Sequence, residues 1–167
     1  MLSTDAQLRL VDEGRKLLHI AYRNGHPARI FDVDLEAPPI TLSCTQFIAL
    51  VFQRTLGSAM ALSFIDDAHS MWQDSKSSLT PVAAQDVQPG DLAFFTRDSM
   101  NPGDPRTGPE GTAQEWHVMM VSRSTSMVIG ACPMLDEARE LDAAQYVQQE
   151  DKGRCWILAG HRRPHGL

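Results

Sequence analysis

The first part of the chain carries apolar residues at helical spacing. Over residues 4–25 they recur every three or four positions, which predicts an amphipathic helix. These apolar positions are Leu8, Val11, Leu18 and Tyr22. Thr4 is a suitable N-cap because Gln7 follows at capping-box spacing, and Gly25 is a suitable end. Residues 26–40 contain three prolines and predict an irregular connection.

Two further helices are expected before residue 75. The second has Thr41 or Ser43 as its N-cap and ends at Gly57. Its broad apolar face consists of Phe47, Ile48, Val51, Phe52 and Leu56. A third helical stretch is expected over residues 59–72, with Met60, Phe64, Ala68 and Met71 on one side.

After Pro81 the pattern changes to short apolar runs bounded by turn residues. Strands are expected over residues 92–95, 117–122, 126–131 and 154–162. Residues 96–115 predict a long loop, and residues 136–149 are compatible with a short helix or a loop. Because helices come first and strands follow, the chain is expected to fold as an α+β domain with an antiparallel sheet.

The length and charge of the chain argue for a single domain and against several classes of function. A chain of 167 residues is the size of one domain, so residues 1–167 are expected to form a single unit. The net charge of -6 and the pI near 5.4 argue against nucleic-acid binding and against adhesion to anionic membranes. The most prominent apolar run, residues 47–52, is far shorter than the roughly 18 residues that a membrane span needs.

Cys44 is the leading candidate for chemistry. It lies at the predicted start of the second helix, where unpaired N–H groups and the helix dipole favour an anion, so we expect a lowered thiol pKa and a nucleophilic sulfur. The alternative is a buried structural cysteine. A nucleophilic thiol needs a base, and among six histidines His117 opens a strand directly after the long loop. The alternative for His117 is an ordinary polar residue at a strand end.

The remaining histidines and cysteines give weaker signals. His19, His26 and His69 are expected to be structural or solvated. The spacing of His161 and His165 could suggest a metal, but they lack a helix and a carboxylate partner. Neither CxxC nor HExxH is present, so no metal site and no cofactor are expected. Whether Cys132 and Cys155 pair is left open by the sequence.

Three motifs follow one another along the chain: residues 43–47 (Ser-Cys-Thr-Gln-Phe), 89–95 (Pro-Gly-Asp-Leu-Ala-Phe-Phe) and 117–121 (His-Val-Met-Met-Val). Together they make the chain, over roughly residues 5–160, resemble the NlpC/p60 family of bacterial cell-wall cysteine peptidases. The resemblance implies a papain-like fold with N-terminal helices packed on a central antiparallel sheet. It also implies Cys44 as the nucleophile and His117 as the base, paired as thiolate and imidazolium.

The sequence departs from the family pattern at three positions. Ser43 stands where the family has Asp before the cysteine, and Gln46 stands where it has glycine. Gly130 occupies the position of the third polar residue, which is often His and orients the base. Either another group orients His117, or a dyad suffices, or the protein is not an active peptidase.

The resemblance implies a hydrolase that acts on amide bonds of peptidoglycan stem peptides, with peptidoglycan or muropeptides as its partners. The alternatives are a CHAP-type amidase or an acyltransferase of the same papain-like group, or a catalytically inactive cell-wall-binding module.

The N-terminal residues lack a basic region followed by an apolar core, so we expect no cleaved signal peptide and synthesis in the cytoplasm. The substrate lies outside the cytoplasm. We therefore hypothesise a secreted antibacterial effector or a phage-type lysis enzyme that acts in the periplasm or cell wall after non-classical secretion. An effector of this kind needs an immunity protein in the producing cell. A cytoplasmic role in muropeptide recycling remains open.

Overall fold

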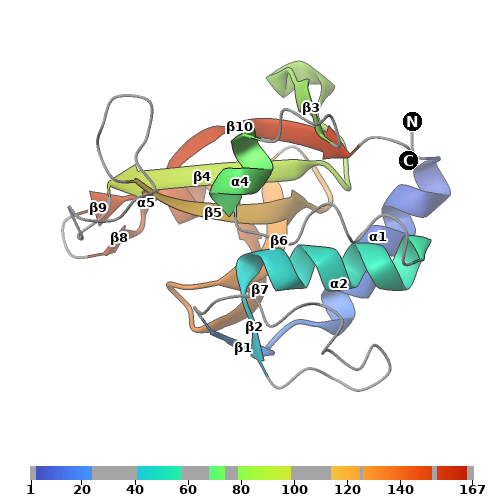
Figure 1. Ribbon diagram of the computed structural model, residues 1–167, viewed down its shortest axis with the longest axis horizontal. Coiled ribbons are helices and arrows are strands. Elements are labelled where there is room, and N and C mark those ends of the chain that lie inside the picture. The colour runs from blue at the N-terminus through green and yellow to red at the C-terminus, as the bar shows by residue number, and fades with distance from the viewer. Residues whose placement is uncertain are drawn as a thin grey trace.

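The computed structural model describes residues 3–23, 41–57, 68–73, 79–98, 114–124, 126–151 and 154–164 (Figure 1). Its helices are α1 (Thr4–Lys16), α2 (Cys44–Leu56), α4 (Ala68–Gln73) and α5 (Ala143–Gln148), with a 3-10 turn at Ala84–Asp86. Its strands are β1 (Ala21–Tyr22), β2 (Thr41–Leu42), β3 (Leu79–Val82), β4 (Leu92–Asp98), β5 (Gln114–Val121), β6 (Met127–Cys132), β7 (Glu137–Asp142), β8 (Glu150–Asp151), β9 (Arg154–Cys155) and β10 (Ile157–Pro164).

Eight of these strands form one sheet in the order β2-β1-β7-β6-β5-β4-β10-β3. Its neighbours pair antiparallel except β1 and β2, which pair parallel at one edge. The predicted α+β architecture, with N-terminal helices on a largely antiparallel sheet, is therefore confirmed. Among the helices that the structure describes, none is long and apolar enough to cross a membrane.

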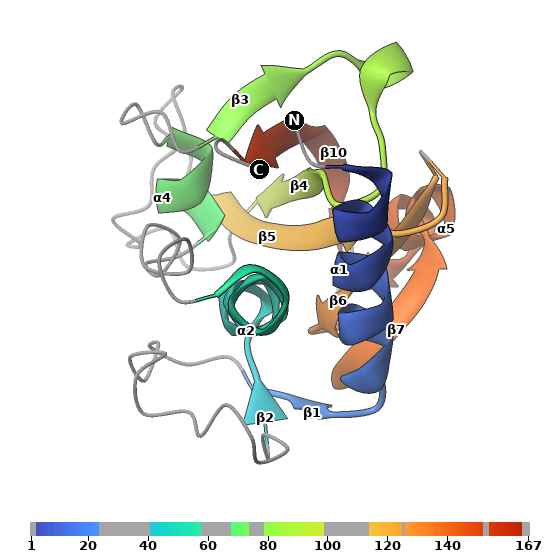
Figure 2. The same ribbon diagram turned by 90° about the vertical axis from the view of Figure 1, so that its right-hand side faces the viewer.

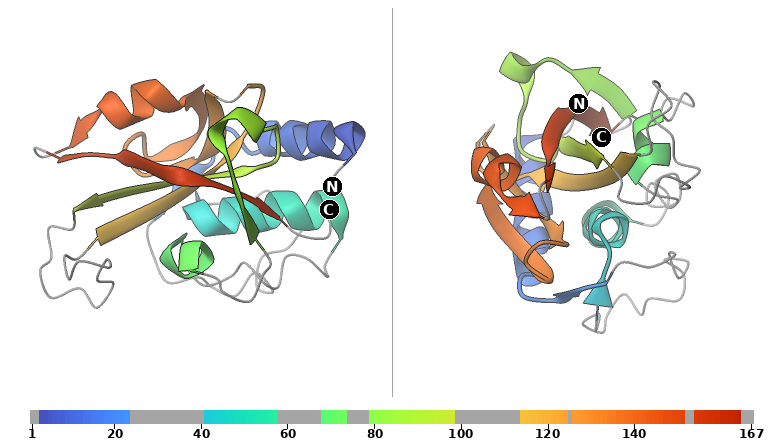
Figure 3. Two further views of the ribbon diagram at one scale, coloured as in Figure 1. Left: turned by 90° about the horizontal axis from the view of Figure 1, so that it is seen from above. Right: turned by 90° about the vertical axis from the view of Figure 1, so that its left-hand side faces the viewer.

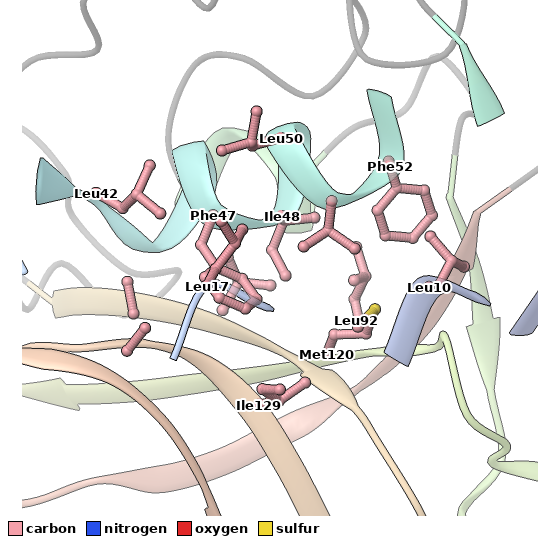
Figure 4. Packing of buried hydrophobic residues seen from close by; sticks show 14 of the residues in the cluster. Leu10, Leu17, Leu42, Phe47, Ile48, Leu50, Phe52, Leu92, Met120 and Ile129 are labelled. Atoms are coloured by element: carbon pink, nitrogen blue, oxygen red, sulfur yellow. The ribbon is translucent and has the colours of Figure 1, made fainter. Parts of the chain in front are cut away.

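The first hydrophobic cluster lies between the sheet and the helices α1 and α2. Figure 4 shows Phe47, Ile48 and Phe52 of α2 packed with strand residues that include Met120 and Ile129. Gly14 of α1 allows a close approach, because a Cβ there would lie 3.4 Å from side-chain atoms of both Met120 and Ile129. The N-terminal helices are thus fixed on one face of the strands.

The second hydrophobic cluster covers the opposite face of the same strands. Successive residues of a strand point to opposite faces, so β5 sends Val118 and Met120 to the first cluster and Met119 and Val121 to the second. Tyr146 of α5 belongs to the second cluster. Figure 3 (left panel) shows α5 and α2 on opposite sides of β4, β5 and β10. Burial on both faces explains the unbroken apolar runs in β4 and β5.

The first helix is shorter than predicted. Its N-cap is Ser3, whose hydroxyl accepts from the Ala6 N–H at 3.3 Å, and Thr4 is the first helical residue. The helix ends at Lys16 because the chain tightens into a turn in which His19 has a φ of 67°. The prediction that the helix continues to Tyr22 is wrong: Tyr22 lies in β1, beyond this turn.

Strands replace part of the predicted loops. β4 and β5 continue as a ladder beyond the expected strand, with Arg97 paired to Glu115, so the 96–115 loop is shorter than predicted. Residues 136–149 are mainly β7 followed by α5, where only a helix or a loop was expected. The third helix is confirmed at Ala68–Gln73, whereas residues 59–67 lie outside the described residues, as do residues 99–113 of the loop.

Leu10 and Leu8 offer a matched test of the α1 packing, because both are leucines in one helix. Leu10 is fully buried and Leu8 is 54% exposed, although the sequence predicted Leu8 in the core. Leu10→Ala is expected to lower the free energy of unfolding by about 2–5 kcal/mol because it leaves a cavity. Leu8→Ala should change it by less than about 0.5 kcal/mol. Urea titrations measure both, and equal losses would contradict this packing.

Candidate functional site

Cys44 is the first residue of α2, and a complete capping box holds this helix start. The Ser43 hydroxyl accepts from the Gln46 N–H at 3.3 Å, while the Gln46 side-chain oxygen accepts from the Ser43 N–H at 3.0 Å. Gly57 ends the helix with a φ of 86°, as predicted. Two of the three departures from the family motif, Ser43 and Gln46, thus serve the same purpose: they fix the turn that carries Cys44.

Tyr22 is placed beside this helix start by the parallel pair β1–β2. Tyr22 pairs with Leu42, two residues before Cys44, and Figure 2 shows β2 running directly into α2 with β1 at its side. Burial raises the pKa of the Tyr22 phenol, and a charge on the nearby Cys44 sulfur raises it further. Tyr22 is therefore a neutral hydroxyl close to the candidate nucleophile.

His117 lies in β5 and is only 1% exposed. Its imidazole faces the second cluster, where its ring centroid lies 6.4 Å from Phe95, 5.7 Å from Tyr146 and 5.6 Å from Trp156. Within the described part of the chain its Nε2 is buried and makes no hydrogen bond. The ring is thus held by aromatic packing.

Burial, and secondarily the positive charge of Arg97, lower the pKa of His117 to about 3. Arg97 is fixed near the ring: its guanidinium lies 4.4 Å from the Trp156 ring centroid, and its Nε lies 2.7 Å from a Glu115 carboxylate oxygen. His117 is therefore neutral at pH 7. The resting thiolate–imidazolium pair implied by the resemblance does not fit this environment, and the same burial makes the neutral imidazole a weak proton acceptor.

The two predicted site residues pack against different clusters. Cys44 is half-buried against the first cluster, whereas His117 faces the second, on the other side of β5 from the body of α2. Tyr146 is their shared neighbour: it contacts the His117 ring, and its pKa is raised by burial, then by Cys132 and Cys44. The assignment of Cys44 and His117 as a catalytic pair stays a prediction.

Sequence reasoning did not identify the two tyrosines as candidate site residues. The chain has only two, Tyr22 and Tyr146, and both lie near Cys44. Tyr22 carried a helical spacing signal, and Tyr146 lay in a stretch without clear pattern. Their scarcity is the one signal that would have drawn attention to them.

Gly130 lies in β6, at the position where the family motif has its third polar residue. A Cβ at this glycine would lie 3.2 Å from Met119 Cγ and 3.4 Å from Met119 Cα. The Met119 side chain therefore crowds the space that an orienting side chain at 130 would need. Residue 130 therefore supplies no group that orients His117, and the three alternatives stated from the sequence stay open.

The other two cysteines do not form a disulfide. Cys132 is buried and Cys155 is exposed, and both are free thiols. Burial raises the pKa of Cys132, which makes it a poor nucleophile at neutral pH. Among the described residues, no group of three or more His, Cys, Asp or Glu side chains is arranged to hold a metal ion.

Comparison with solved structures identifies the fold. An NLP/P60-family protein described as similar to a lipoprotein, from Staphylococcus aureus, superposes with a TM-score of 0.60 at 20% identity, covering 98% of this chain and 42% of that one. NlpC1 from Trichomonas vaginalis gives a TM-score of 0.57 at 16% identity, covering 98% and 45%. No family model and no curated sequence matches the chain. The chain spans less than half of each of these two structures, and its fold is the papain-like fold that the motifs predicted.

The buried neutral His117 predicts a specific pH dependence of stability. In the unfolded chain histidine titrates near 6.5, whereas folded His117 titrates at about 3, so the unfolded state binds one more proton between these values. Stability should therefore fall as the pH drops from about 6.5 towards 3, by about 5 kcal/mol in total from this residue. Urea titrations from pH 7.5 to 4 measure the loss.

His117→Leu supplies the control. Leucine does not titrate, and the carboxylates, which also titrate in acid, are the same in both proteins. The variant should lose clearly less stability than the wild type between pH 6.5 and 4. The same loss in both proteins would show that His117 is not buried in its neutral form.

Proposed function

We propose that residues 1–167 act as one catalytic domain, a cysteine hydrolase that cleaves amide bonds in peptidoglycan stem peptides. The observation that carries the proposal is the position of Cys44 as the first residue of a capped helix within an NlpC/p60-like fold. Support also comes from Tyr146, which lies close to Cys44 and contacts His117. Because this chain spans less than half of the matched structures, the activity of the whole protein is also part of this proposal.

In the proposed mechanism the Cys44 sulfur attacks the carbonyl carbon of the scissile amide while neutral His117 accepts the thiol proton. Backbone N–H groups in the first turn of α2, including that of Cys44, stabilise the oxyanion. The carbon–nitrogen bond then breaks, and His117 gives its proton to the leaving amine. Water attacks the thioester, losing a proton to His117, and the released thiolate takes that proton back.

Replacing the nucleophile tests this mechanism directly. Cys44→Ala should abolish cleavage of purified muropeptides without changing the urea midpoint greatly, because Cys44 is only half-buried. Cys155→Ala, which removes an exposed thiol, should keep wild-type activity. Mass spectrometry of the digest measures the products, and full activity of Cys44→Ala would refute the mechanism.

The same digest decides which bond is cut. A product released at the sugar–peptide junction identifies a CHAP-type amidase, and a product cut within the stem identifies an endopeptidase. Transfer of the acyl group to an added amine identifies an acyltransferase of the same papain-like group.

A second candidate function is a non-catalytic module that binds the cell wall. The observation in its favour is that His117 is almost fully buried and faces away from the body of α2. Such a module would sediment with insoluble peptidoglycan and leave it uncut, and Cys44 would react with iodoacetamide no faster than a simple thiol.

We further propose that the protein acts in the periplasm or cell wall, where peptidoglycan lies, as an antibacterial effector or a phage-type lysis enzyme. Expression in the cytoplasm should then be harmless, and expression behind a periplasmic signal sequence should lyse the cells. Cys44→Ala with the same signal is the control and should not lyse. Co-expression of the immunity protein of the producing cell should restore growth. Normal growth of cells that export the wild type would contradict the proposal.

A further inference from the structure

His117 is enclosed by three aromatic rings, Phe95, Tyr146 and Trp156, which we call the aromatic box. Phe95 is the cross-strand partner of His117 on β4, Tyr146 comes from α5, and Trp156 lies between β9 and β10. Tyr146 is the central ring of the box, because it contacts both other rings: Phe95 edge-on at 5.0 Å and Trp156 in a stacked arrangement at 5.9 Å. Its ring also lies 5.7 Å from that of His117.

Polar contacts do not explain how the imidazole is oriented. Within the described residues His117 Nε2 makes no hydrogen bond, and Gly130 offers no side chain. The Tyr146 hydroxyl is itself buried without a hydrogen-bond partner in the described structure. Tyr146 therefore acts on His117 through contact of its ring, which is tilted by 39° from the imidazole, since its hydroxyl makes no bond to the imidazole.

We propose that Tyr146 is a positioning residue: its ring, packed on the imidazole within the aromatic box, fixes the orientation of His117 in place of a third polar side chain. Aromatic pairs at these separations contribute about 0.5–1.5 kcal/mol each beyond the burial of their area. Three such contacts on one ring are enough to favour a single orientation over its alternatives.

The helix that carries Tyr146 is anchored to the sheet at its N-terminus. Asp142, the last residue of β7, is the N-cap of α5, and its carboxylate accepts from the Ala144 N–H at 2.7 Å. The ionisable groups that act on the box are Arg97 on β4, Cys132 on β6, Cys44 on α2 and Tyr22 on β1. Tyr146 thus keeps water from His117 as well as fixing its plane.

The catalytic consequence rests on the proposed function, so the test combines two readouts. Imidazole NMR titrations of labelled protein report the pKa of His117 without requiring activity, and muropeptide hydrolysis reports kcat and KM. Tyr146→Leu should raise the His117 pKa towards the ordinary value of about 6.5, since water then reaches the ring. It should also lower kcat by about 10- to 100-fold with little change in KM, because a misplaced base reacts slowly.

Two comparison variants separate positioning from general destabilisation. Tyr146→Phe keeps the ring and should match the wild type in both readouts. Phe52→Leu also removes a fully buried ring, but from the first cluster, and should leave the His117 pKa and kcat unchanged despite its loss of stability. If Tyr146→Leu does not fold, Tyr146→Met carries the same expectation.

The proposal is overturned if Tyr146→Leu leaves the His117 pKa and kcat as Phe52→Leu does. It is also overturned if Tyr146→Phe loses as much as Tyr146→Leu, because the hydroxyl would then be the active part. If the wild type cuts no muropeptide, the proposed function is refuted but the positioning role of Tyr146 is not. In that case an NMR contrast between Tyr146→Leu and Phe52→Leu still supports the positioning role.

Discussion

The arrangement of this molecule depends on the burial of both faces of β4 and β5. One face packs against α1 and α2, and the other packs against α5 and Trp156. Because neighbouring residues on a strand point to opposite faces, a single residue step decides which cluster a side chain joins. Val118 therefore lies beneath the helices, while His117 lies in the aromatic box.

This constraint shapes the chemistry that the site can support. A histidine enclosed by aromatic rings and near Arg97 remains neutral. The same environment makes it a weak base, so proton transfer from Cys44 in the proposed mechanism costs more than transfer to a solvated histidine would. The capping box of Ser43 and Gln46 fixes the turn that carries Cys44 independently of the sheet. Tyr146 contacts the His117 ring, and a charge on Cys44 contributes to raising its pKa, after burial and Cys132.

Much of the fold could be predicted from the sequence because its signals are local. The apolar face after Ser43, the glycine at 57 and the Pro-Gly-Asp turn before β4 each depend on nearby residues. The end of α1 and the strand β1 could not be predicted, because β1 is fixed by pairing with β2 and β7, far away in the sequence. Likewise Tyr146 reaches His117 only through the packing of α5 on the second face.

Cys44 was singled out by its place at a helix start and His117 by its place at a strand start, and motif order paired them. None of these signals says which face of the sheet a side chain occupies, so their relation to the two clusters required the structure. The most direct test of the account is a crystal structure of the Cys44→Ser protein with a bound muropeptide. We expect the scissile carbonyl carbon to lie beside residue 44 at the start of α2, with a His117 ring nitrogen within hydrogen-bond reach of the serine hydroxyl. A muropeptide bound elsewhere, or a His117 ring that stays beyond reach of residue 44, would contradict it.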